Sequence, residues 1–319
     1  MPDVQNPTFH TALSERAVEK LLSYGAMCIE AQAGLRLLNG YLHEMSLVAS
    51  GVPYSELGIS ERRKASCAVS VWMPNPMGDG GTMVQDKGLL SNTALTRPQS
   101  VAILKLSGAM TMGDDISSYG VGTIESQLRQ AYSNDNIGAV ILETNSPGGE
   151  VTAMQLLVGA IEDRNKPVIG FGHFAASAAY GTLAATDEII ASNKMAEFGS
   201  VGAVITLDRA FLEFYKENFL TFYGDDAPNK NEVWRAALEG NFAPVQKAAN
   251  EATQNFQTQV SKQRSLTGGE AYQKTTLSGA MFGAVDARRR GLVDGIGTMN
   301  YALSRAAAWM QKGKRKKAA

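Results

Sequence analysis

The chain has 319 residues, of which 44% are hydrophobic, so it can bury a sizeable core in one large or two moderate domains. Its 30 basic residues balance 31 acidic ones, which excludes a global electrostatic attraction to nucleic acid or to a membrane surface. Cys28 and Cys67 are too few for a disulfide framework and lack metal-site spacing, so we expect both thiols to be reduced. The chain opens without a basic region followed by an apolar run, and it contains no apolar stretch of bilayer-spanning length. These features predict a soluble, cytoplasmic protein.

Residues 1–98 are expected to form an N-terminal extension that is mostly helical. Apolar residues recur at helical spacing from Ser14, a suitable N-cap, to Met45, although three glycines interrupt the pattern. The alternating segment 66–73 predicts a strand, and the Pro- and Gly-rich segment 74–81 predicts a loop.

Residues 99–305 alternate strand and helix patterns and are expected to form one α/β domain. Such alternation predicts βαβ units and a mainly parallel sheet, with function at the carboxyl ends of the strands. The expected strands are 101–106, 137–142, 167–171 and 188–191, and the expected helices are 124–132, 151–161, 177–185, 252–260 and 301–310.

Residues 306–319 form a basic C-terminal tail that contains the cluster 312–317. The simplest expectation is a solvated end, because chain termini commonly fray. The alternative is a weak electrostatic contact of this tail with nucleic acid or with an acidic assembly partner.

Two turns in the α/β domain carry the chemistry. Ser177 lies in a run of small residues between a predicted strand and a short helix, and Gly148 lies in a Pro-Gly-Gly turn between the preceding strand and helix. Acyl-transfer enzymes place a nucleophilic serine on such a strand-to-helix turn and direct bare N–H groups at the oxygen that gains charge. The expected oxyanion donors are the N–H groups of Gly148 and Ala178. Gly149 lies beside them as a candidate substrate-groove residue. The turn with Gly199 and Ser200 could wall the same peptide groove or simply connect two strands.

A serine hydroxyl needs a base within hydrogen-bond reach. His10 and His43 precede the α/β domain, His173 is expected on the loop before Ser177, and no histidine follows Ser177. A triad would require His173 to fold back onto its neighbour, which favours a lysine as the base. A lysine amine must be neutral to accept a proton, so the catalytic lysine has to be desolvated or lie near positive charge. The residues alone leave several candidates open, among them Lys194, Lys216, Lys230 and Lys247.

Four ordered blocks of this sequence resemble the signal peptide peptidase A (protease IV) family of serine peptidases, within the Clp protease/crotonase superfamily. The blocks are Asn145 to Val151, Ala176 to Ala191, Phe198 to Gly202, and Gly279 to Asp294. The resemblance implies a Clp/crotonase-like fold of repeated ββα and βαβ units and a Ser-Lys dyad without metal or cofactor. The family lysine follows the serine in a glycine-containing segment. Here that position is Lys230, after Tyr223-Gly224, although the acidic residues and proline of this segment depart from the pattern.

The resemblance also implies polypeptide substrates and a homo-oligomer in which the groove is assembled between protomers. Because no N-terminal anchor is evident, the preferred role is that of the soluble prohead proteases of tailed phages, which cleave scaffold and capsid proteins in the host cytoplasm or the prohead. An inactive family member that serves as a head-assembly or scaffold protein is the alternative. An acyl-CoA enzyme of the crotonase type would share the Gly148 turn but would not need Ser177. The histidine of the Clp proteolytic subunit would fall at Gly202, which argues against its mechanism.

Overall fold

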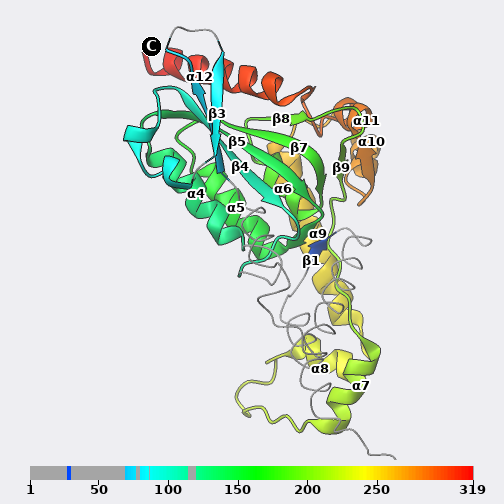
Figure 1. Ribbon diagram of the computed structural model, residues 1–319. Coiled ribbons are helices and arrows are strands. Elements are labelled where there is room, and N and C mark those ends of the chain that lie inside the picture. Colours follow the sequence, from blue (N-terminus) through cyan, green and yellow to red (C-terminus); the bar gives the residue numbers. More distant parts are fainter. Residues whose placement is uncertain (1–26, 30–68, 77–79, 86, 114–119, 319) are drawn as a thin grey trace, which may run out of the picture.

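The computed structural model describes residues 27–29, 69–76, 80–85, 87–113 and 120–318 (Figure 1). Most of the helical segment expected up to Met45, together with His10, His43 and Cys67, lies outside these residues, but Met27–Ile29 within that segment forms a strand, which corrects the helical expectation there. The described strands are β1 (Met27–Ile29), β2 (Val69–Pro74), β3 (Gly81–Gln85), β4 (Ser100–Ser107), β5 (Ile137–Ser146), β6 (Gly148–Glu150), β7 (Val168–Ala176), β8 (Glu188–Ala191), β9 (Glu197–Gly199), β10 (Met281–Gly283) and β11 (Gly295–Ile296). The described helices are α4 (Val121–Ser133), α5 (Val151–Glu162), α6 (Ala178–Ala184), α7 (Arg209–Asn218), α8 (Glu232–Leu238), α9 (Ala243–Gln263), α10 (Glu270–Thr276), α11 (Ala284–Arg290) and α12 (Met299–Ala318).

The main sheet runs in the order β10-β9-β7-β5-β4-β2-β3. Its centre, β4-β5-β7, is parallel, whereas β2, β3 and β10 pair antiparallel with their neighbours. The mixed α/β class with a mainly parallel sheet, and the strands expected within it, are therefore confirmed.

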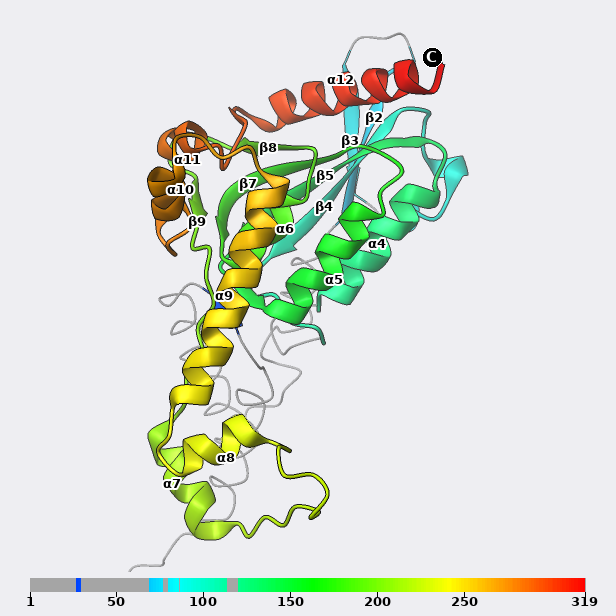
Figure 2. The same cartoon turned by 180° about the vertical axis from the view of Figure 1, so that it is seen from behind.

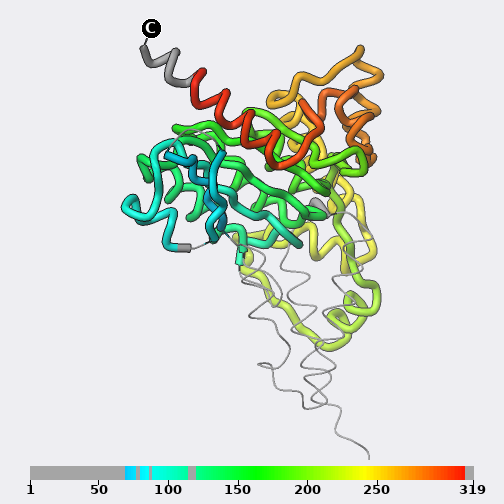
Figure 3. The backbone as a smooth tube through the Cα atoms, turned by 45° about the horizontal axis from the view of Figure 1, so that its top comes forward, coloured from blue at the N-terminus to red at the C-terminus, as the bar shows by residue number. Residues whose placement is uncertain are grey.

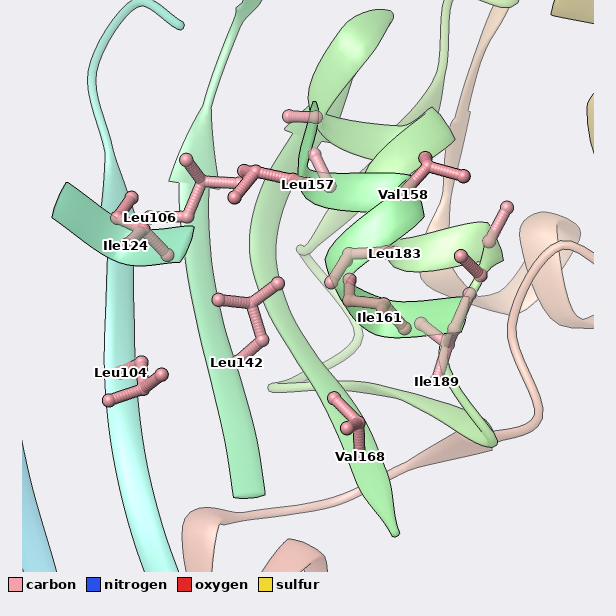
Figure 4. Packing of buried hydrophobic residues seen from close by; sticks show 14 of the residues in the cluster. Leu104, Leu106, Ile124, Leu142, Leu157, Val158, Ile161, Val168, Leu183 and Ile189 are labelled. Atoms are coloured by element: carbon pink, nitrogen blue, oxygen red, sulfur yellow. The ribbon is translucent and has the colours of Figure 1, made fainter. Parts of the chain in front are cut away.

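Helices cover both faces of this sheet (Figures 1 and 2). The larger core lies on the side of α4, α5 and α6, where Leu142 of β5 and Val168 of β7 belong to the same buried cluster as Leu157 of α5 and Leu183 of α6 (Figure 4). On the opposite face α12 covers a smaller cluster that includes Met310. Both faces of the central strands are buried, which accounts for their nearly continuous apolar sequences.

Strand β7 changes partner along its length, and this change positions the site. Its first half pairs in parallel with β8, from Ile169 to Gly172, and its second half pairs in parallel with β9, from Phe174 to Ala176. Strand β9 in turn pairs with β10 on its other edge. The end of β7 is therefore held between β5 and β9 immediately before Ser177.

Helices α7 and α8 and the first turns of α9 form an arm that extends from the sheet (Figures 1 to 3). The far half of α9 returns to the body, where Phe256 and Val260 are buried. The apolar spacing of 252–260 thus predicted the part of α9 that packs against the domain, but not the arm.

The sheet and its covering helices extend past both expected boundaries of the α/β domain. Strand β2 pairs with β4, so residues before 99 belong to the same sheet. Helix α12 runs from Met299 to Ala318, and its Ala306 and Met310 are buried, so a boundary at 305/306 falls inside a packed helix. The buried apolar face of α12 carries the helix into the segment that was expected to be only a tail.

The contact between α9 and α6 gives a stability test. The Phe256 ring is 2% exposed and lies against Gly181 of α6, where an added Cβ would come 2.7 Å from a ring carbon. Phe256→Ala should lower the free energy of unfolding by about 3–5 kcal/mol in urea denaturation, because it leaves a cavity beside α6. Met195 is 87% exposed, so Met195→Ala is the matched control and should change stability by less than about 0.5 kcal/mol. Equal effects of the two substitutions would contradict this packing.

Candidate active site

The two sequence-predicted turns lie at neighbouring strand ends. Strands β5 and β7 are parallel, and Ser146 near the end of β5 is the register partner of Ala175 near the end of β7. Gly148 follows β5 and Ser177 follows β7. Helix α6, which begins directly after Ser177, packs against β6, which begins at Gly148. The fold therefore brings the serine turn and the glycine turn together, as the sequence predicts.

Ser177 has a strained backbone that the surrounding structure holds in place. Its φ is 56° and its ψ is −123°, a combination that residues with a Cβ rarely adopt. The Ser177 N–H donates to the Gly199 carbonyl at 2.8 Å, and the Ser177 carbonyl accepts from the Gly181 N–H at 2.9 Å. The Oγ lies 3.4 Å from the Gly202 carbonyl, and the residue is 1% exposed. This is the sharp strand-to-helix turn that a nucleophilic serine requires.

Gly199 and Ser200 lie directly beside the serine turn, since the Gly199 carbonyl accepts the Ser177 N–H. Gly199 has φ 134°, and a Cβ on it would lie 2.4 Å from the Ala280 carbonyl oxygen, so the close approach requires glycine. Ser200 also has a positive φ, 55°, and its N–H donates to the same Ala280 carbonyl at 2.8 Å. The sequence marked these residues as a small-residue turn. It gave no signal that the Gly199 carbonyl would fix the Ser177 N–H.

The Gly148 turn is held by a hydroxyl that sequence reasoning missed. Gly148 has φ 93°, and its N–H donates to Ser146 Oγ at 3.2 Å, while that hydroxyl donates to the Gly108 carbonyl at 2.6 Å. A neutral hydroxyl at this distance is a weak hydrogen-bond acceptor. A negatively charged oxygen would therefore compete favourably with Ser146 Oγ for the Gly148 N–H. The second expected donor, the Ala178 N–H, is at the first residue of α6, where the helix itself provides no acceptor.

His173 lies within β7 rather than on a loop, which corrects the sequence-based expectation. Its Nε2 is 3.1 Å from Glu143 Oε1 of the adjacent strand β5, and its ring meets Phe171 edge-on at 5.2 Å. The imidazole is therefore engaged with Glu143 and not with Ser177, in agreement with the argument against a triad.

Lys230 is not brought to Ser177 within one chain. It lies in the turn before α8, exposed, with its backbone N–H donating to the Ala227 carbonyl at 3.1 Å. Helix α8 packs against α7 and α9 and lies at the far end of the molecule from α6 (Figures 1 and 2).

A different lysine shows what burial does to an amine in this protein. Burial lowers the pKa of Lys166, whose Nζ donates to the carbonyls of Ala131 and Asn134 at 2.9 and 2.6 Å. Lys166 precedes β7, whereas Ser177 follows it, so this amine lies at the opposite end of the strand from the nucleophile. Lys166 therefore supports the fold and takes no part in the site around Ser177.

Within the described part of the chain, no group of three or more His, Cys, Asp or Glu residues could hold a metal ion. None of the helices described above is long and apolar enough to cross a membrane.

Comparison with known protein families finds a match for the region that contains the Ser177 turn. Residues 160–313 match peptidase family S49. The match begins in α5 and includes Ser177, β9, the arm and most of α12, whereas the Gly148 turn lies just before it.

Curated relatives extend the similarity over about two-thirds of the chain. Protease 4 of Haemophilus influenzae is 30% identical over 222 residues, which cover 66% of this chain and 34% of that protein. The chloroplastic serine protease SPPA of Arabidopsis thaliana is 28% identical over 217 residues, 64% of this chain and 31% of the relative. The chain thus spans about a third of the length of these relatives.

Solved structures are more distant. A mutant form of the membrane-bound stomatin-specific protease 1510-N aligns with TM-score 0.37 and 16% identity over 62% of this chain and 78% of that chain. An enoyl-CoA hydratase/carnithine racemase from Magnetospirillum magneticum aligns with TM-score 0.39 and 13% identity over 69% and 73% of the two chains.

The strain at Ser177 can be measured without any assay of activity. Ser177→Gly and Ser177→Ala remove the same hydroxyl, but only glycine adopts this backbone conformation without strain. Glycine also raises the conformational entropy of the unfolded chain, which offsets part of this gain. Ser177→Gly should therefore be about 1 kcal/mol more stable than Ser177→Ala in urea denaturation. If Ser177→Ala were the more stable variant, the turn would not be strained.

Proposed function

We propose that this protein is a serine endopeptidase and that Ser177 is its nucleophile. The observation that carries the proposal is the strained backbone of Ser177, fixed by hydrogen bonds beside the Gly148 turn. Ser177 lies inside the region that matches peptidase family S49. Ser177 Oγ attacks the scissile carbonyl carbon while a base takes the hydroxyl proton, and the N–H groups of Gly148 and Ala178 hold the resulting oxyanion. The base then returns the proton to the leaving amine, and water hydrolyses the acyl-enzyme in the same way.

We assign the base to Lys230 supplied by a neighbouring copy of the chain. The resemblance of the sequence points to Lys230, and the fold of one chain holds it on the arm, away from its own Ser177. An amine acts as a base only when it is neutral, which requires the desolvation that docking against a second protomer would provide. An isolated chain would therefore hold a positioned nucleophile without a base.

The arm has a surface suited to such docking. Large apolar side chains are exposed along it, among them Leu220 and Phe222, at 89% and 88%, with Phe219 and Phe242 half exposed. Large exposed apolar side chains that gather on one part of a protein mark protein-protein contacts. A second copy is the occupant that we propose, because it would cover these side chains and complete the site in one contact.

The narrower role that we propose is cleavage of scaffold or capsid proteins during maturation of a phage head, in the host cytoplasm or within the prohead. Its support is the resemblance of the four ordered sequence blocks to the signal peptide peptidase A family, whose soluble branch includes the prohead proteases of tailed phages. Incubation of the protein with candidate scaffold and capsid proteins, followed by mass spectrometry of the products, tests this role separately from the peptidase chemistry.

The nucleophile assignment predicts the result of serine-directed labelling. A fluorophosphonate should label the wild-type protein at Ser177, and Ser177→Ala should abolish labelling, because the probe needs an activated hydroxyl in an oxyanion-binding turn. Ser278 is an exposed serine whose hydroxyl donates to the Thr275 carbonyl, and Ser278→Ala should label like the wild type. Unchanged labelling of Ser177→Ala would sink the assignment.

Sharing of the dyad between protomers predicts complementation. Ser177→Ala and Lys230→Ala should each be inactive on a polypeptide substrate at alkaline pH. An equal mixture, dissociated and reassembled, should recover roughly a quarter of the wild-type sites, since random pairing unites intact Ser177 with intact Lys230 at that frequency. A mixture of Ser177→Ala with Lys216→Ala is the control, because Lys216→Ala should itself be active. No recovery in the first mixture would place the base within the same chain or on another residue.

A non-catalytic assembly protein is the second candidate, and the separation of Lys230 from Ser177 within one chain is the observation that favours it. The two candidates differ in the assembled protein. If the purified oligomer, Ser177→Ala and Lys230→Ala were all equally inert toward peptide and probe, the assembly role would replace the peptidase.

A further inference from the structure

Strand β1 lies against the glycine turn of the site and is distant from it in sequence. Met27–Ile29 pairs antiparallel with Gly148–Glu150, with Met27 opposite Glu150 and Ile29 opposite Gly148. These two strands form a sheet of their own, separate from the main one. Strand β1 therefore contacts the proposed oxyanion turn through its backbone.

Strand β6 has two hydrogen-bonding edges. The hydrogen bonds formed on one edge show which backbone N–H and C=O groups face the other edge. The Gly148 carbonyl accepts from the Met110 N–H at 2.9 Å, and the Glu150 N–H donates to the Met110 carbonyl at 2.8 Å. Along an extended strand, successive residues direct their N–H and C=O groups to opposite edges. Gly149 therefore presents its N–H and C=O on the edge away from Met110, which is where Cys28 is its register partner.

On one edge of β6, Gly149 packs directly against the Met110 backbone. A Cβ at this position would lie 2.0 Å from the Met110 carbonyl oxygen, so the strand is seated directly on the Met110 backbone. The opposite edge is thus a fixed pair of donor and acceptor beside the nucleophile. A fixed strand edge of this kind binds an extended polypeptide by adding it as a further strand.

The direction of β1 is that of a substrate. Because the pairing is antiparallel, residues 27 to 29 run from Glu150 toward Gly148. A polypeptide whose scissile carbonyl reaches the Gly148 N–H, and whose preceding residues pair with β6, would run in the same direction. Strand β1 therefore occupies the positions of the residues that precede the scissile bond.

We propose that Met27–Ile29 is an internal, substrate-like ligand that occupies the peptide-binding edge of Gly149 and keeps other polypeptides out until it is displaced. The proposal rests on the proposed function, which identifies the Gly148 turn as the oxyanion site. It predicts a competition within one chain: the affinity for an external extended peptide is reduced by the fraction of molecules in which β1 is seated.

Proline at position 28 tests the competition in the full-length chain. Cys28 is the residue paired with Gly149, and proline there removes the N–H that faces the Gly149 carbonyl. In a Ser177→Ala background, which prevents cleavage, we would measure binding of a fluorescein-labelled peptide of residues 22–33 by fluorescence anisotropy. Cys28→Pro should tighten binding of this peptide about tenfold or more, because it frees the edge.

Asp135→Pro is the matched control, since it places the same residue at an exposed position of the turn that the Ile137 N–H closes on the Asn134 carbonyl, and it should change the affinity less than about twofold. Equal affinities of the Cys28→Pro and Asp135→Pro proteins would overturn the proposal. Peptide binding needs no turnover, so its outcome is independent of the labelling and complementation experiments that decide the proposed function.

Hydrogen exchange of the parent protein provides a second test that needs no substitution in β1. If β1 is seated, the amides of Cys28 and Gly149 should exchange at least about tenfold more slowly than in an unstructured chain, because each faces a carbonyl of its partner. Addition of the 22–33 peptide in excess should speed exchange at Cys28 and leave Gly149 protected, since the peptide replaces β1 on the same edge. Unprotected amides at both positions in the parent protein would also overturn the proposal.

Discussion

The hydrogen bond from the Ser177 N–H to the Gly199 carbonyl is the constraint on which the rest of the site depends. It closes the last step of the β7-β9 ladder and holds Ser177 at a positive φ that costs of order 1–3 kcal/mol. The fold tolerates this backbone strain because β9 is fixed on both edges, by β7 and by β10, and because Phe198 within β9 is fully buried. The hydroxyl is thereby fixed at the start of α6, and the Ala178 N–H follows it with no acceptor inside the helix.

The branching of β7 gives this arrangement its place in the fold. Strand β8 leaves the sheet edge after pairing with the first half of β7, and β9 takes over the second half, so the carboxyl end of β7 has a neighbour on both sides. On the β5 side, the Gly148 turn is seated on Met110 and Ser146. The proposed oxyanion site is thus formed by backbone groups whose positions are set by ladder pairing, which is why small residues dominate it.

The body of the protein holds the proposed nucleophile and oxyanion donors, whereas the proposed base lies on the arm. This division separates two demands that conflict in one folded chain. A catalytic lysine must be desolvated, but an arm that reaches a neighbour must be exposed before it docks. Assembly would meet both demands, and the seated β1 strand would add a second condition, that the peptide-binding edge be cleared. Both devices act on the same few atoms around Gly148 and Ser177.

The sequence by itself determined the local features of this protein. Alternating apolar segments predicted the parallel sheet and the helices that cover it, because buried strands and amphipathic helices have distinct periodicities. The small residues around Gly148 and Ser177 predicted the two turns, because only small side chains fit where the backbone is crowded. Tertiary structure decided what local patterns do not encode: the Gly199 carbonyl that pins Ser177, the Ser146 hydroxyl under Gly148, the pairing of His173 with Glu143, and the position of Lys230 on an arm. Each of these depends on which distant strands and helices become neighbours, and that is set by packing of the whole chain and not by the residues within any one turn.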